Sequence, residues 1–232
     1  MVTTSKAQAL VRCEDAARTY GSGPNAVVAV HGATCEVQPG DRIALMGPSG
    51  SGKTTLLHLM AGLDEPTVGT VSWPALGSRQ ELTPGPLAIV FQAPSLLPPL
   101  DVLENVALPL LLQGRGRTEA MAKARLALDR LDLGELAAKL PEELSGGQAQ
   151  RVAVARVLAG EPRLILADEP TGQLDQHTGT QVIDELIGAA TELGAALVIN
   201  THDPAVANRF LLRWEMADGR LRVPDGSATC SA

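Results

Sequence analysis

The glycine-rich segment Gly47-Pro48-Ser49-Gly50-Ser51-Gly52-Lys53-Thr54-Thr55 separates two largely apolar runs of the chain. Residues 42–46 before it have the composition of a short strand, and residues 56–61 after it have that of a helix. The spacing G-x-x-x-x-G-K-[ST] between a strand and a helix is typical of a phosphate-binding loop. The sequence therefore predicts a strand, a tight glycine-rich turn and a helix here.

The residue types in this segment suit a nucleoside triphosphate. Glycines let backbone N–H groups turn inward around phosphate oxygens, and the positive end of the following helix points to the same place. The Lys53 ammonium can reach the β- and γ-phosphates, and the Thr54 hydroxyl can bind a Mg²⁺ ion. A turn that merely joins strand to helix is the alternative, but the flanking patterns favour binding of ATP or a related nucleotide.

Length and composition describe one folded domain with room for a subdomain. The chain has 232 residues, of which 45% are hydrophobic and 19% charged. The net charge of -7 argues against a nucleic-acid partner, because duplex binding needs an extended basic face. Cys13, Cys35 and Cys230 are odd in number and lack metal-ligand spacing, which favours a reduced cytosolic setting over a disulfide scaffold.

No segment of the sequence is expected to cross a membrane or to direct secretion. Residues 1–10 lack the apolar core of a signal peptide. The longest apolar stretch, residues 102–112, is shorter than the roughly 20 residues that span a bilayer, and polar residues and a proline interrupt it. Any membrane role must therefore come through a partner protein.

The rest of the chain alternates strand-like and helix-like segments, which predicts an α/β fold with a mixed or parallel central sheet. Strands are expected at 10–19, 26–37, 42–46, 67–74, 87–91, 163–167 and 195–200, with a closing hairpin at 209–223. Residues 76–86 are expected to form a loop and residues 226–232 a loose tail. The strand at 67–74 is expected to return to the N-terminal strands.

Helix formers dominate residues 102–158, and a further helix is expected at 178–192. We interpret the first of these regions as a helical insertion between two strands of the core. The sequence thus predicts a single domain made of a core, residues 1–92 and 159–232, and a helical subdomain, residues 93–158.

Strands that end in polar residues add to the candidate site. The strand at 163–167 runs into Asp168-Glu169, where Asp168 can hold Mg²⁺ and Glu169 can orient water for attack on a γ-phosphate. A capped turn is the alternative for this acidic pair. His202 follows the strand at 195–200; a single histidine is more often structural, but at the carboxyl edge of a parallel sheet it faces the ligand crevice.

Two segments have two interpretations each when they are taken alone. Tyr20, the single tyrosine, is either a half-buried aromatic at a strand end or a ring that stacks on a purine, and position alone favours the first. Leu144-Ser145-Gly146-Gly147-Gln148 precedes a helix that carries Arg151 and Arg156. It is either a second anion-binding corner or a simple helix cap, and alone the cap is the better interpretation.

With these pieces in order, the chain resembles the nucleotide-binding domain of ATP-binding cassette (ABC) proteins along nearly its whole length. Residues 144–148 match the family's signature motif, which is far more specific than the phosphate loop. By position, the resemblance implies that Tyr20 stacks on adenine and that Gln92 and His202 are the Q-loop glutamine and the switch histidine. Leu174-Asp175 matches the D-loop. The implied fold is a P-loop NTPase core with an N-terminal antiparallel β-subdomain and a helical signature subdomain.

The resemblance also implies an ATPase that works as a dimer. Two such domains pair head to tail, and each ATP lies between one phosphate loop and the partner's signature residues 145–148. Glu169 acts on the attacking water, His202 holds the γ-phosphate, and Gln92 links the metal site to the partner protein. Since the chain carries one cassette, we expect a homodimer or a heterodimer with a related cassette. The implied metal ligands are Thr54, Gln92 and Asp168.

Three segments look like the cassettes that serve lipoprotein release, macrolide export and cell-division permeases, the LolD, MacB and FtsE types. These segments are Val90-Phe91-Gln92 with residues 96–98, residues 102–110, and residues 167–175. Permeases of that group have few transmembrane helices and large outer domains, so the resemblance implies a subunit held by a permease at the cytoplasmic face of the membrane. The chain departs from the group's usual residues at Asp101, Ala149, Gln173 and Asn200, none of which is a catalytic group.

Two other functional classes remain open from the sequence. A soluble ABC ATPase of DNA repair or translation is disfavoured by the single cassette, the acidic balance and the lack of a long coiled-coil insertion. A nucleotide-gated binding module that hydrolyses poorly is disfavoured by Glu169 and His202. The apolar, proline-marked stretch at residues 95–112 looks like a docking surface for a permease helix, with plain core as its alternative.

Overall fold

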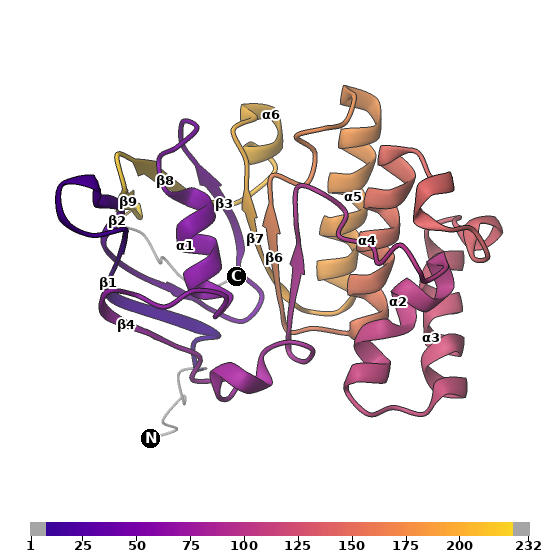
Figure 1. Cartoon of the computed structure of the whole chain (residues 1–232). Helices are drawn as coiled ribbons and strands as arrows, with labels where there is room; N and C mark the ends of the chain where they lie inside the picture. Colours follow the sequence, from indigo (N-terminus) through magenta and orange to yellow (C-terminus); the bar gives the residue numbers. More distant parts are fainter. Residues whose placement is uncertain (1–7, 225–232) are drawn as a thin grey trace, which may run out of the picture.

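The computed structural model describes residues 8–224, so the tail predicted at 226–232 and Cys230 lie outside the described residues. The glycine-rich segment joins strand β3 (Arg42–Met46) to helix α1 (Lys53–Met60), as predicted. Residues 43–45 of the strand and residues 56–57 of the helix are fully buried, so both elements lie in the core on either side of the turn. The strand–turn–helix unit is therefore set in the centre of the molecule (Figure 1).

The central sheet has six strands in the order β5-β6-β7-β3-β8-β9. Its strands are parallel except for the last pair, so the predicted mixed sheet is confirmed. The further strands are β5 (Leu87–Val90), β6 (Leu164–Asp168), β7 (Ala196–Asn200), β8 (Leu212–Ala217) and β9 (Arg220–Arg222). Because β6 and β7 flank β3 on one side, their carboxyl ends come to the same edge as the glycine-rich turn.

The predicted closing hairpin forms from β8 and β9, but β8 does more than end the chain. It pairs in parallel with β3, with Ile43 opposite Leu212 and Met46 opposite Glu215, and so becomes an inner strand of the sheet. Sequence alternation predicts the hairpin from local turn residues, whereas the pairing with β3 depends on contacts more than 160 residues apart in sequence.

A second, three-stranded antiparallel sheet has the order β2-β1-β4, as expected for an N-terminal β-subdomain. Its strands are β1 (Val11–Tyr20), β2 (Val27–Val37) and β4 (Val68–Ser72). Helix α1 contacts strands of both sheets and lies between them in Figure 1. Cys13 and Cys35 are opposite each other on β1 and β2, buried and unbridged.

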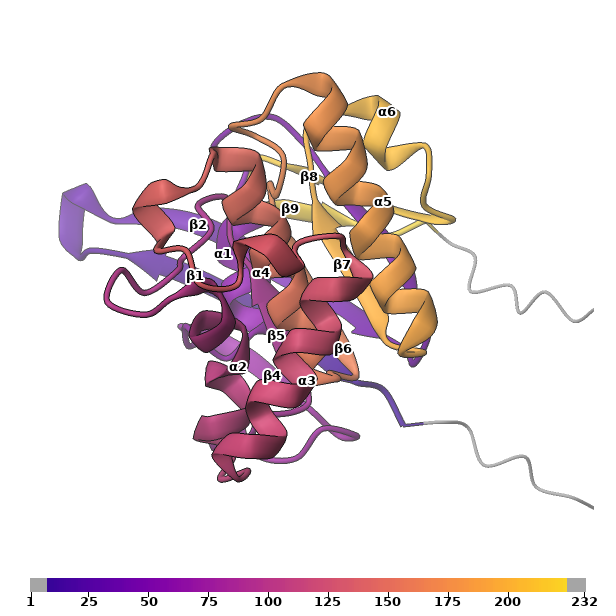
Figure 2. The ribbon, with the colours of Figure 1, turned by 90° about the vertical axis from the view of Figure 1, so that its right-hand side faces the viewer.

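The predicted helical insertion lies between β5 and β6. Its helices are α2 (Val102–Leu112), α3 (Arg117–Arg130) and α4 (Gly146–Gly160), and α5 (Gln176–Glu192) and α6 (Pro204–Ala207) follow β6 and β7. Short 3-10 turns occur at Gly23–Asn25, Arg79–Glu81, Gly134–Leu136 and Pro141–Glu143. Figures 1 and 2 show α2, α3 and α4 side by side, on the opposite side of the central sheet from the three-stranded sheet.

The hydrophobic core has two parts, one on each face of the central sheet. One face packs against α1 and the three-stranded sheet, and the other packs against α2 to α5.

Helix α5 begins two residues before the predicted start at 178, because the Asp175 side chain accepts hydrogen bonds from the N–H groups of His177 and Thr178. Within residues 8–224, no helix has the length and hydropathy of a membrane span.

Candidate functional site

The phosphate loop has a shape that only glycine permits at two of its positions. A Cβ atom on Gly47 would lie 2.0 Å from the Met216 carbonyl oxygen, and one on Gly52 would lie 2.1 Å from the Ala29 carbonyl oxygen. Both residues also have positive φ, at 151° and 99°. The backbone of β2 and β8 therefore closes against the loop, and its other face is left for a ligand.

The polar groups of the loop are placed to meet an anion. Lys53 is 4% exposed, and its ammonium donates hydrogen bonds to the carbonyl oxygens of Gly47 and Pro48, both at 2.9 Å. The Ser51 hydroxyl is buried and has no hydrogen-bond partner within residues 8–224. Pro48, Ser49, Gly50 and Thr54 are exposed and Thr55 is half-buried. A ligand oxygen at the exposed face of the loop would meet the positive end of α1.

Asp168 ends β6 beside the first turn of α1 and is 8% exposed. Its Oδ1 atom accepts a hydrogen bond from the Thr54 hydroxyl at 3.1 Å. The same oxygen accepts a second hydrogen bond, at 2.5 Å, from the side-chain amide of Asn200 at the end of β7. The structure thus brings together Thr54 and Asp168, the hydroxyl and carboxylate predicted to hold Mg²⁺.

Glu169 follows directly and adopts a φ of 43°, in the left-handed region that side-chain-bearing residues rarely enter. Its Oε2 atom lies 3.4 Å from His202 Nδ1, and the His202 side chain is 64% exposed. The Gln92 side chain borders the same place, because a Cβ atom on Gly172 would meet Gln92 Nε2 at 2.9 Å and Glu169 Oε2 at 3.5 Å. Glu169, His202 and Gln92 therefore gather at the carboxyl edge of the sheet.

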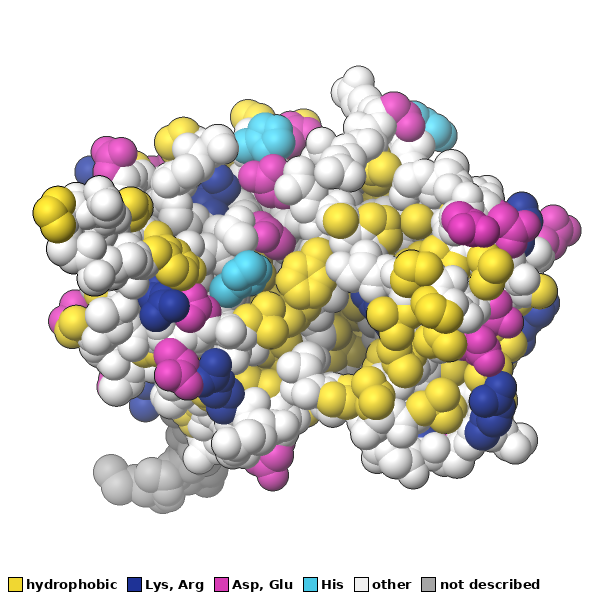
Figure 3. All heavy atoms as spheres, in the orientation of Figure 1, with side chains coloured by type: hydrophobic (Ala, Val, Ile, Leu, Met, Phe, Trp, Pro, Cys, Tyr) yellow, Lys and Arg dark blue, Asp and Glu magenta, His cyan; other side chains and the backbone are white. Residues whose placement is uncertain are grey.

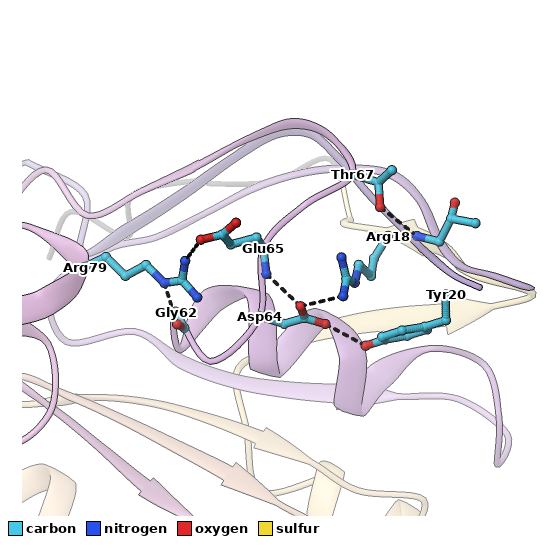
Figure 4. Close-up of polar contacts among 8 residues, drawn as sticks. Arg18, Tyr20, Gly62, Asp64, Glu65, Thr67 and Arg79 are labelled. Carbon is cyan, nitrogen blue, oxygen red and sulfur yellow. Dashed lines mark hydrogen bonds and ion pairs between the residues drawn. The ribbon is translucent and has the colours of Figure 1, made fainter. Parts of the chain in front are cut away.

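Tyr20 lies at the end of β1, 40% exposed, and a network holds its ring (Figure 4). Its hydroxyl donates to Asp64 Oδ2 at 2.8 Å, and Arg18 pairs with Asp64 Oδ1 at 2.8 Å. The Arg18 guanidinium carbon is 4.7 Å from the ring centroid, in cation–π range. Burial would raise the pKa of Asp64, but the hydrogen bonds from Tyr20 and the Glu65 N–H and the charge of Arg18 outweigh it, so the pKa lies below its ordinary value.

The signature segment lies at the start of α4, away from the phosphate loop. The Ser145 hydroxyl accepts a hydrogen bond from Gln148 N–H at 3.2 Å, and the Gln148 side chain accepts one from Ser145 N–H at 3.0 Å. This is a capping box, so the helix-cap interpretation is correct for the local structure. Ser145, Gly146 and Asp175 are nevertheless exposed, and no hydrogen bond within residues 8–224 joins this segment to the phosphate loop.

Sequence reasoning missed three side chains that connect these pieces. Gln150 on α4 is 1% exposed and donates to the Phe91 carbonyl, directly before Gln92. Arg156 donates to the carbonyls of Pro94 and Ser95, and burial lowers its pKa. The third is Asn200. Gln150 and Arg156 pair with distant backbone and Asn200 pairs with a distant side chain, which leaves no local signal, although a glutamine on the apolar face of a helix is itself unusual.

A largely apolar hollow of about 410 Å³ is lined by residues of α2, β5 and α4 and by Leu63, which follows α1. Figure 3 shows hydrophobic side chains on both sides of it. Leu63 and Leu112 beside it are 48% and 65% exposed. The stretch at 95–112 divides accordingly: Val102, Val106 and Leu110 are buried in the core, while Leu108, Pro109 and Leu112 line the hollow. Part of that stretch is therefore plain core, and the docking surface stays a prediction for the residues that line the hollow.

A family model described as "ABC transporter" matches residues 30–172, which include the phosphate loop, the signature segment and Asp168-Glu169. The chain belongs to the ABC transporter family.

Relatives of known name cover almost the whole of this ABC protein. It is 40% identical over 225 residues to a lipoprotein-releasing system ATP-binding protein LolD of Shewanella oneidensis, covering 94% of this chain and 98% of that protein. Another LolD, from Pseudomonas fluorescens, is 40% identical over 222 residues, with 92% and 97% covered. The predicted likeness to the LolD-type group is thereby confirmed.

Solved ABC cassettes have the same fold. The ATP-binding cassette MJ0796, as a dimer in a post-hydrolysis state bound to ADP and Pi, superposes with a TM-score of 0.82 at 34% identity, covering 93% of this chain and 99% of that one. A second dimeric structure of MJ0796 gives the same TM-score at 35% identity. This ABC protein is accordingly the ATP-binding and ATP-hydrolysing subunit of a transporter complex, built on the P-loop NTPase fold.

Proposed function

We propose that this ATPase drives a membrane permease with few transmembrane helices and a large extracytoplasmic domain, of the kind that works in lipoprotein release. The observation that carries this proposal is the near full-length identity with LolD proteins, at 40% over 94% of the chain. The exposed apolar hollow beside α2 gives such a permease a docking place on a subunit whose described helices do not span a membrane. The subunit would thus work at the cytoplasmic face of the membrane.

Within one chain, we assign the nucleotide to the residues that surround the phosphate loop. Gly47 to Thr55 would wrap the phosphates with backbone N–H groups, and Lys53 would leave its two carbonyl partners to meet the β- and γ-phosphates. Tyr20, which is 40% exposed, would stack on the adenine.

The oxygen atoms of Thr54 and Asp168 fit Mg²⁺, which accepts one or two protein oxygens and completes its shell with phosphates and water. The Gln92 side-chain oxygen would be a further ligand. Within residues 8–224, no group of three or more His, Cys, Asp or Glu side chains could hold a metal alone, in keeping with an ion that shares its ligands with the nucleotide. When bound, Mg²⁺ would neutralise the charge that develops on the phosphates.

Glu169 would orient the attacking water and accept its proton, and His202, 3.4 Å away, would hold the γ-phosphate and keep Glu169 aligned. Residues 145–148, of which Ser145 and Gly146 are exposed, and the exposed Asp175 would bind the nucleotide of a second cassette. We therefore propose a head-to-tail dimer, with a homodimer and a heterodimer of related cassettes both compatible with the single cassette of this chain. The dimeric MJ0796 structures support this arrangement.

Capture from native membranes tests the proposed partner. Tagged Glu169→Gln with Mg-ATP should bring down a permease with few transmembrane helices and a large outer domain. Lys53→Ala, whose ATP affinity should be much lower, is the control for the dimerised state. A many-helix permease with a solute-binding protein would instead make the chain an importer subunit. Recovery of DNA or ribosomes alone would favour the soluble ATPase and contradict the proposal.

A further inference from the structure

The chain contains two completely buried asparagines, and they differ in how their side chains are satisfied. Asn105 on α2 accepts from the Leu97 N–H and donates to the carbonyls of Leu97, Leu100 and Asp101, so every bond goes to backbone. Asn200 instead donates to the Asp168 carboxylate, and its Oδ1 atom has no partner within residues 8–224. Asn105 thus holds the backbone of residues 97–101, the loop before α2, and its role is structural. Asn200 makes its one side-chain hydrogen bond to a residue of the candidate site.

The position of Asn200 explains which of its atoms faces Asp168. It ends β7, a strand in which all five residues are buried, and it is the register partner of Asp168 on β6. A carboxylate only accepts hydrogen bonds, so the Nδ2 group of Asn200 must face Asp168 Oδ1, at 2.5 Å. The backbone carbonyl oxygen of Asn200 also accepts a hydrogen bond from the Glu169 N–H at 3.0 Å. Asn200 therefore contacts both acidic residues of the site.

Two donors converge on one oxygen of Asp168. The Thr54 hydroxyl and the Asn200 amide both bond to Oδ1, from α1 and β7 respectively. This arrangement fixes the rotation of the carboxylate and leaves its Oδ2 atom outside these two bonds. An amide buried with its oxygen unpaired costs stability, and such costs concentrate at functional sites.

We propose that Asn200 is a positioning residue for the divalent cation, holding the Asp168 carboxylate so that it faces the metal and its water. The inference rests on the proposed Mg²⁺ site at Thr54 and Asp168. Asn200 would touch neither nucleotide nor metal and would act through Asp168 alone. A purely structural asparagine would lower stability when replaced, but it would leave the metal dependence of nucleotide binding unchanged.

Asn200→Leu tests the inference, since leucine has nearly the same shape and lacks the donor. The affinity for a non-hydrolysable ATP analogue is measured by calorimetry with Mg²⁺ and with EDTA. We expect affinity with Mg²⁺ to fall about 10-fold, the usual loss when a partner of a metal ligand is removed, and affinity in EDTA to stay at the wild-type value. Asn200→Ala, which also lacks the donor, replaces this variant if leucine does not fold.

Asn105→Leu is the matched control: it should lower the melting temperature and keep the wild-type Mg²⁺ dependence. Asp168→Asn is the reference for loss of the metal site. If Asp168→Asn loses the Mg²⁺ dependence and Asn200→Leu keeps it, the positioning role is wrong and the metal site stands. If the wild-type protein binds the analogue equally well with Mg²⁺ and with EDTA, the proposed metal site is wrong and the inference fails with it.

Discussion

We propose phosphate binding at two helix N-termini, and the two sites differ in how much of each the chain completes by itself. Around α1, Lys53 and Asp168 are buried, and their polar atoms are bonded to other parts of the chain. At α4, Ser145 is exposed and its side-chain bond stays within its own capping box. The first site is preformed in one chain, and the second is an open surface. Changes at the first should therefore alter chemistry and binding, and changes at the second should alter assembly.

Glu169→Gln should have the largest effect and should separate binding from chemistry at the α1 site. We expect turnover to fall about 1,000-fold, because a glutamine cannot accept the proton of the attacking water. ATP binding should persist, and the protein should accumulate as a dimer with Mg-ATP. Phosphate release and size-exclusion chromatography measure the two effects. Glu161→Gln, on the surface beside Lys123, is the control and should keep wild-type turnover. If Glu169→Gln also keeps wild-type turnover, Glu169 has no part in the mechanism.

Lys53→Ala should lower ATP affinity about 100-fold, because the change removes a buried ammonium that would make charge-assisted bonds to two phosphates. Equilibrium binding of a fluorescent ATP analogue to the isolated chain measures this directly. Lys123→Ala removes a lysine whose pairing with Glu161 is on the surface, and it should bind ATP as the wild-type protein does. Equal affinities in both variants would show that the α1 site is not the place where one chain holds ATP.

The same contrast shows what the sequence could and could not predict. The phosphate loop lies within nine consecutive residues, so its spacing and the apolar runs on either side predicted β3, the turn and α1. Asp168, Glu169 and His202 were placed because each follows an apolar strand, and parallel strands end at one edge.

Contacts between distant segments could not be predicted in this way. Tyr20 and Asp64 are 44 residues apart, and Asp168 and Asn200 are 32 apart. Whether two such side chains meet depends on strand order and register, which a single sequence does not fix. For the same reason the roles of Gln150 and Arg156, which bond to backbone near Gln92, appear only in the structure.

Gly147→Ala examines the open site at α4. The added Cβ would lie 2.4 Å from Thr178 Cγ2, so the Thr178 side chain or the start of α4 must shift. We expect turnover to fall about 10-fold through weaker dimerisation, and ATP binding by the single chain to stay unchanged. Adding Thr178→Ser removes the clashing methyl group. Recovery of turnover in the double variant assigns the effect to the clash, whereas loss of single-chain ATP binding would contradict the separation of the two sites.

Asp64→Ala should give the smallest effect and should show how far the preformed site extends. The change removes the partner of both the Tyr20 hydroxyl and the Arg18 guanidinium. The Tyr20 ring, on which adenine would stack, must then become ordered when ATP binds, and we expect ATP affinity to fall about 3-fold. Tripolyphosphate lacks the base, and its affinity should not change. Glu65→Ala is the matched control, because the neighbouring acid pairs with Arg79 instead. An equal loss for ATP and tripolyphosphate would mean that Asp64 supports binding of the phosphates. The proposal that Asp64 holds the Tyr20 ring in place for the adenine would then be wrong.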